Sequence, residues 1–178
     1  MEKGYLQIYT GNGKGKTTAA FGLAVRALCA GKNVFIGQFV KSMKYNETKI
    51  AKLLDSAEND FGKIEIRQYG RGCFIGRNPE ETDKALAASG LAECAKSLKD
   101  GKWDVVILDE LNIALHFGLI GEDEVRKALS ARNPQTEIII TGRYAPQWLI
   151  DAADLVTEMQ EVNHYYRKGV LSRNGIDR

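Results

Sequence analysis

Apolar runs of about four to eight residues alternate along the chain with longer mixed segments, and glycine or polar residues bound the runs. Short β-prone runs predict strands, and longer segments of helix-forming residues predict helices. Strands are predicted at residues 5–9, 33–40, 64–68, 103–108 and 138–141, with a candidate last strand at 155–159. Helices are predicted at 16–30, 46–56, 79–98 and 122–131. This order predicts an α/β fold with a mainly parallel β-sheet flanked by helices.

The bulk composition indicates an ordinary soluble globular protein. The 178 residues are 44% hydrophobic and 27% charged, and no linker or repeat divides them, so we predict a single domain over residues 1–178. The net charge of +2 is too small to indicate a nucleic-acid or membrane partner. No stretch has the length of a signal peptide or a membrane span, so a cytoplasmic protein is expected. Three widely spaced cysteines predict free thiols rather than a disulfide framework or a zinc site.

The segment IYTGNGKGKTTAAFG, residues 8–22, carries the strongest chemical signal. It nearly matches the phosphate-binding pattern G-x-x-x-x-G-K-[ST], but its first glycine comes one residue late, at Gly11. Glycines allow backbone N–H groups to converge on phosphate oxygens, and the following helix directs its N-terminus at the same anion. Lys16 adds a positive charge, and the Thr17 hydroxyl is placed to bind Mg²⁺. A strand before the loop and a helix after it favour a nucleotide site over an incidental glycine-rich turn.

Several polar residues follow other predicted strands. Asp109 and Glu110 end the strand WDVVIL, where ligands bind in open α/β sheets and where a phosphate-bound Mg²⁺ finds oxygen ligands. Lys41 and Arg143 also follow strands, so either could contact a nucleotide. By itself Arg26 is a surface or ion-pair residue. A solvated acidic strand end is the alternative for Asp109 and Glu110.

Segments along nearly the whole chain resemble one known family. The loop TGNGKGKTTAAFG, the stretches GQFVK, WDVVILDELNIAL and IIITGR, and the tail EVNHYYRKGVLSRNGID are similar to the P-loop type of ATP:corrinoid adenosyltransferase. The resemblance implies a P-loop NTPase (RecA-like) fold. It also implies that the shortened loop holds the γ-phosphate of a reversed ATP, which leaves the ribose C5′ open to the Co(I) of a reduced corrinoid. Triphosphate is then the leaving group.

The resemblance implies roles for individual residues. The triphosphate would be wrapped by Gly11, Asn12, Gly13, Lys14, Gly15, Lys16, Thr17 and Thr18, with Asn12 also meeting the adenosine. Lys16 and Glu110 would act in catalysis. Arg26, Lys41 and Arg143 would contact the nucleotide. Thr17, Asp109 and Glu110 would hold Mg²⁺ (or Mn²⁺). No general base is needed, because Co(I) is already a strong nucleophile, and His164 is expected to be structural.

The corrinoid site departs from the family pattern. Relatives carry an aromatic pair after the glycines, whereas this chain has Cys73 and Ile75 at those positions with Phe74 between them. Either Phe74 takes over the aromatic role, or the corrinoid is bound differently. The family also suggests a reduced flavoprotein as electron donor and a homodimer. Longer relatives have an N-terminal segment over the site, for which this chain is expected to have no counterpart.

Two other functions compete with adenosyl transfer. A P-loop ATPase or small-molecule kinase would act on the γ-phosphate, and a nucleotide-binding regulator would only sense ATP or a corrinoid. The shortened loop disfavours the usual phosphate placement of the first, and the acidic pair Asp109-Glu110 argues against the second.

Overall fold

A six-stranded sheet forms the centre of the protein, whose computed structural model describes residues 2–41, 45–55, 60–71 and 79–177. The strand order is β3-β2-β4-β5-β1-β6, and all neighbouring strands run parallel. The strands are β1 (Leu6–Thr10), β2 (Val34–Phe39), β3 (Ile64–Tyr69), β4 (Val105–Asp109), β5 (Glu137–Thr141) and β6 (Leu155–Glu158). The α/β prediction with a parallel sheet is therefore confirmed.

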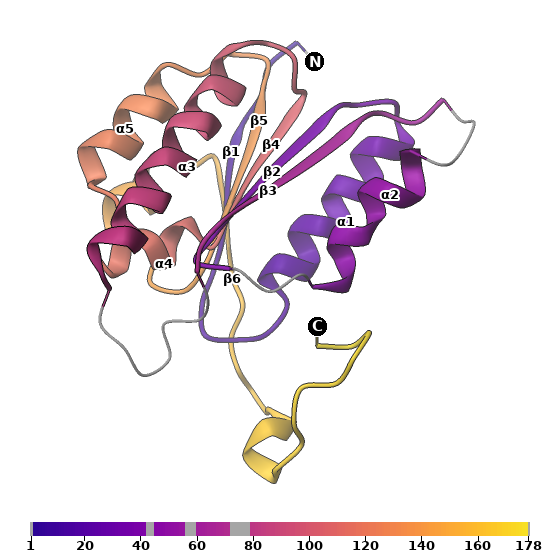
Figure 1. Ribbon diagram of the computed structural model, residues 1–178, viewed down its shortest axis with the longest axis vertical. Helices are drawn as coiled ribbons and strands as arrows, with labels where there is room; N and C mark the ends of the chain where they lie inside the picture. The colour runs from indigo at the N-terminus through magenta and orange to yellow at the C-terminus, as the bar shows by residue number, and fades with distance from the viewer. Residues whose placement is uncertain (1, 42–44, 56–59, 72–78, 178) are drawn as a thin grey trace.

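Helices cover both faces of the sheet (Figure 1). One face carries α1 (Lys16–Cys29) and α2 (Ile50–Asp55), which follows the 3-10 turn η1 (Asn46–Lys49). The other face carries α3 (Glu81–Lys99), α4 (Leu111–His116) and α5 (Glu122–Ser130). The chain also forms α6 (Gln147–Ala152) and the 3-10 turn η2 (Tyr165–Lys168). No helix in the described part of the chain is both long and apolar enough to cross a bilayer.

The two hydrophobic cores follow from the alternation of side chains along the central strands. Val105 and Ile107 of β4 pack with the α1 side of the sheet, whereas Val106 and Leu108 pack with the α3 and α5 side. All four are at most 2% exposed. Successive side chains of a strand point to opposite faces, so a strand covered on both faces must be apolar throughout. Full burial of each such side chain contributes about 1.5–3 kcal/mol.

The helix boundaries differ in places from the prediction. The helix predicted at 79–98 begins at Glu81, because Glu80 caps it and the backbone N–H of Glu80 donates to the Asp83 carboxylate at 2.9 Å. Two short helices, α4 and α6, were not predicted. With six residues each, they are too short for a clear helical repeat of apolar positions.

Candidate nucleotide site

The phosphate loop joins β1 to α1 at the edge of the sheet where the strands end. Gly11 and Gly15 have φ angles of 91° and 117°, in the left-handed region that glycine adopts without strain. The loop also packs closely on the chain after β6, where the Gly13 N–H donates to the Met159 carbonyl at 2.6 Å. A Cβ at Gly11 or Gly13 would lie 2.4 or 2.7 Å from that carbonyl oxygen. These glycines are therefore required by the shape of the loop.

The side chain of Lys16 turns back into the loop that precedes this residue. Its side-chain nitrogen donates to the carbonyls of Gly11 at 2.7 Å and Gly13 at 2.6 Å, and the residue is only 7% exposed. Burial lowers the pKa of Lys16, against the opposing effect of Glu110. The amine thus lies where several loop groups converge, and phosphate oxygens could replace the two carbonyls as its partners.

Asp109 lies at the centre of a network that joins four segments. One carboxylate oxygen accepts from the hydroxyls of Thr17 at 2.8 Å and Thr141 at 2.7 Å. The other accepts from Gln38 at 2.9 Å and from the Lys41 amine at 2.7 Å. The side chain is fully buried. Burial alone would raise the pKa of Asp109, but Lys41 and these hydrogen bonds outweigh burial and lower it.

Glu110 is the residue of the acidic pair whose carboxylate is free. No hydrogen-bond donor reaches this carboxylate within the described ranges, although the Glu110 N–H donates to the Thr141 hydroxyl at 2.9 Å. Burial, together with the neighbouring Asp109, raises the pKa of Glu110. The carboxylate is therefore available to a ligand.

Backbone strain is concentrated at this edge of the sheet. Among the described residues, three that are not glycine have positive φ, namely Val40 at 64°, Glu110 at 62° and Tyr144 at 62°. Each follows the end of a strand, β2, β4 or β5. Such conformations cost about 1–3 kcal/mol each and are found preferentially at functional sites.

The oxygen atoms of this site fit a magnesium ion that arrives with a nucleotide. Mg²⁺ is usually bound by one or two carboxylates and by substrate phosphates. Thr17 and Glu110 supply a hydroxyl and a free carboxylate, whereas both Asp109 oxygens already accept two hydrogen bonds each. In the described part of the chain no three acidic, histidine or cysteine side chains are grouped to hold a metal. These residues therefore suit a metal site whose other ligands are substrate phosphates, rather than a site in which the protein supplies every ligand.

The remaining predicted site residues lie in different places. Lys14 points to the C-terminal tail, with its amine 3.2 Å from the Ile176 carbonyl oxygen, and Thr18 is exposed in the first turn of α1. Arg26 is exposed in the last turn of α1, about 15 Å along the helix from Lys16 at 1.5 Å per residue. The structure thus does not bring Arg26 to the loop.

The predicted corrinoid residue Phe74, with its neighbours Cys73 and Ile75, lies outside the described residues.

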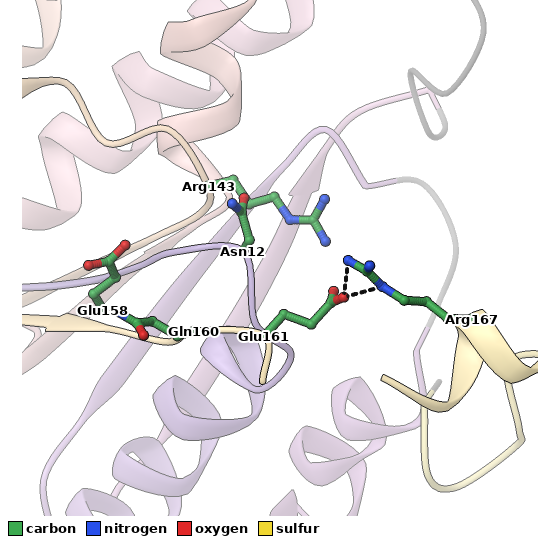
Figure 2. Close-up of a pocket in the computed structure, with 6 residues that line it drawn as sticks. All are labelled: Asn12, Arg143, Glu158, Gln160, Glu161 and Arg167. Carbon is green, nitrogen blue, oxygen red and sulfur yellow. Dashed lines mark hydrogen bonds and ion pairs between the residues drawn. The ribbon is translucent and has the colours of Figure 1, made fainter. Parts of the chain in front are cut away.

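A cavity of about 400 Å³ opens beside the loop (Figure 2). Its lining comes from the loop, the segment after β5, the end of β6 and the C-terminal tail: Asn12, Arg143, Glu158, Gln160, Glu161 and Arg167. Of these residues, only Asn12 and Arg143 are predicted from the sequence. The candidate strand at 155–159 could have indicated Glu158 and its neighbours, since it ends at the same edge. Arg167 has no such signal, because only the path of the tail brings it there.

The parallel sheet and the glycine loop between β1 and α1 are those of a P-loop NTPase-type fold. Residues 2–177 match the family described as ATP:corrinoid adenosyltransferase BtuR/CobO/CobP. The corrinoid adenosyltransferase CobA of Salmonella typhimurium is 36% identical over 176 residues, which are 99% of this chain and 86% of that protein. Corrinoid adenosyltransferases of a Sinorhizobium species and of Escherichia coli K12 are 34% and 35% identical, over 99% of this chain and 81% and 86% of theirs. The chain therefore belongs to the ATP:corrinoid adenosyltransferase family and is a transferase.

Proposed function

We propose that the protein transfers the 5′-deoxyadenosyl group of ATP to the Co(I) of a reduced corrinoid and releases triphosphate. The observation that carries this proposal is the family match over residues 2–177 in a chain that keeps the shortened loop. The cobalt donates an electron pair to C5′ and a cobalt–carbon bond forms. The bond from C5′ to oxygen breaks, and triphosphate leaves with its electron pair.

The site supports this reaction by stabilising the leaving group. The triphosphate gains negative charge as the C5′–oxygen bond breaks, and fixed donors that face this charge lower the barrier. We assign this role to the loop N–H groups and to Lys16, whose amine already lies inside the loop. The amine of Lys14 can contribute as well, because an ammonium group has three donor hydrogens.

A divalent cation is part of the proposal. Thr17 and Glu110 would hold Mg²⁺ (or Mn²⁺), and Asp109 would orient the Thr17 hydroxyl from 2.8 Å. When bound, the ion would offset negative charge on the triphosphate. Lys41 keeps Asp109 ionised through their contact of 2.7 Å, so the network stays intact around neutral pH.

Three further points belong to the same proposal and rest on the family resemblance. They are a homodimeric assembly, a reduced flavoprotein as electron donor and a cytoplasmic location. The free thiols of Cys29 and Cys94 are compatible with a reducing compartment. Sedimentation equilibrium would test the dimer, since a monomer would have the mass of one 19.7 kDa chain.

Product analysis tests the reaction directly. The protein is incubated with ATP, Mg²⁺ and chemically reduced cobalamin, and the products are separated under dim light. We expect equal amounts of triphosphate and a light-sensitive adenosylcorrinoid. ADP and phosphate without the adenosylcorrinoid would instead identify a γ-phosphate enzyme. Tight ATP binding without any product would identify a nucleotide sensor.

A further inference from the structure

The C-terminal tail, residues 159–177, returns to the phosphate loop at the carboxyl edge of the sheet (Figure 1). At its start, the Met159 carbonyl accepts from the Gly13 N–H at 2.6 Å. Near its end, the Lys14 amine lies 3.2 Å from the Ile176 carbonyl oxygen and 3.4 Å from the Asp177 carboxylate. The tail therefore contacts the loop at two points that are far apart along the tail.

A group of contacts joins the end of the tail to its 3-10 turn and to the loop. We call this group the tail clasp; it is formed by Lys14, Tyr165, Arg173 and Asp177. The Asp177 carboxylate accepts from the Tyr165 hydroxyl, from the Arg173 N–H at 3.0 Å and from the Arg173 guanidinium at 3.2 Å. The Arg173 guanidinium also lies over the Tyr165 ring, 4.6 Å from its centre. With only 9% of its side chain exposed, Asp177 is the shared acceptor that joins the tail to Lys14.

Two residues of the same tail, Glu161 and Arg167, line the cavity beside the loop. Arg167 and Glu161 form an ion pair of 2.6 Å, and Figure 2 shows the guanidinium of Arg143 directed toward the same space. The two arginines of the cavity balance its two glutamates, so its formal charge is zero. The cavity therefore offers little net attraction to phosphate, in contrast to the loop with its two lysines.

A nucleoside has the chemistry that this lining suits. Ribose hydroxyls donate to carboxylates, the edges of adenine pair with amides such as those of Asn12 and Gln160, and guanidinium planes stack on aromatic rings. The volume of about 400 Å³ is within the range of small-molecule sites. The cavity also adjoins Asn12 of the loop, so a nucleotide bound by its phosphates could reach it.

We infer that Glu161 and Arg167 bind the nucleoside half of ATP and that Asp177, through the tail clasp, positions them. The inference rests on the proposed function, since it requires the triphosphate to be bound by the loop. Glu161 and Arg167 are then binding residues, and Asp177 is a positioning residue. Lys14 can hold the tail and a phosphate oxygen together, because its two tail partners, Ile176 and Asp177, leave one of its three donor hydrogens available.

Calorimetric titration with two ligands separates the halves of the site. ATP reports on both halves, whereas inorganic tripolyphosphate reports on the loop alone. For Arg167→Ala and Glu161→Gln we expect the affinity for ATP to fall about tenfold or more, as for the loss of a charged hydrogen bond, with tripolyphosphate affinity unchanged. Lys168→Ala removes a cation from the same 3-10 turn but outside the cavity, and should leave both affinities unchanged.

The outcomes distinguish the inference from the proposed function. Unchanged ATP affinity in both variants, or an equal loss for ATP and tripolyphosphate, would overturn the inference. If the unmodified protein binds neither ligand, the proposed function fails and the inference fails with it.

The positioning role of Asp177 has its own readout. Asp177→Asn should raise the KM for ATP about tenfold and leave kcat at saturating ATP close to that of the unmodified enzyme, because the reacting groups are untouched. Asp177→Glu, which keeps the carboxylate, should restore most of the loss. A fall in kcat with unchanged KM, or equal defects in both variants, would contradict positioning through this carboxylate.

Discussion

Lys16 is held in place before any nucleotide arrives. Its amine donates to two loop carbonyls, and its side chain is nearly excluded from water. A flexible exposed lysine would lose side-chain entropy on binding phosphate, whereas this one is already ordered. Its lowered pKa reflects the burial that this position demands. A single residue thus combines the charge that a triphosphate needs with a geometry formed in advance.

We expect Lys16→Ala to abolish ATP binding and turnover while the fold is retained. The variant loses the charge inside the loop, but the sheet and its two cores do not involve this side chain. ATP binding is measured by calorimetry and folding by circular dichroism. Lys99→Ala, at the exposed end of α3, is the matched control. ATP affinity equal to that of the unmodified protein would argue against this loop as the phosphate site.

At the scale of elements, the Asp109 network joins the start of α1 to three strand ends. Thr17 comes from α1, Lys41 from the segment after β2, and Thr141 from the end of β5. A buried carboxylate with four donors is stable only while its partners remain, because an unpaired buried charge is costly. This network therefore fixes the loop relative to the sheet.

Lys41→Met tests the network as a structural unit. We expect the free energy of unfolding to fall by about 2–4 kcal/mol, somewhat less than for a fully buried pair because the Lys41 side chain is 15% exposed. Urea denaturation provides the measurement. Lys52→Met, on the exposed surface of α2, should change it by less than about 0.5 kcal/mol. Similar stability losses in the two variants would show that the ion pair with Asp109 contributes nothing specific.

At the scale of the whole molecule, the site depends on segments from both ends of the chain. The loop follows the first strand, and the tail that lines the cavity extends from the last strand to Asp177 and beyond. These segments meet because β1 lies between β5 and β6, so the carboxyl end of β6 delivers the tail beside the loop. A ligand that contacts both segments should stabilise the folded chain as a whole.

ATP with Mg²⁺ should therefore raise the unfolding temperature. Binding at about one hundred times the Kd adds about 2.7 kcal/mol to the free energy of unfolding. Removal of Mg²⁺ with EDTA should shrink the shift, since Thr17 and Glu110 would lose the ion that joins them to the phosphates. Differential scanning calorimetry of the unmodified protein and of Lys16→Ala checks this. A shift that persists in Lys16→Ala would place the nucleotide elsewhere.

Local chemistry accounts for the features that were predicted correctly. The run WDVVIL is apolar at successive positions, as a strand covered on both faces must be, and β4 lies in the middle of the sheet. The Gly15-Lys16 step marks the start of a helix, and α1 begins at Lys16. The features missed are α4, α6 and the return of the tail. In each, contacts with distant residues outweigh a weak local preference.

The sequence by itself determined the parallel α/β fold, the shortened phosphate loop and the family, because each is carried by residues that are neighbours along the chain. Only the tertiary structure decided that Asp109 has four donors and that the Glu110 carboxylate has no donor among the described residues. It also decided that Glu161 and Arg167 share a cavity with Asn12. Such relations depend on strand order and on the path of the tail. The donors to Asp109 lie 32 to 92 positions from it along the chain, and the tail residues of the cavity lie more than one hundred positions from Asn12.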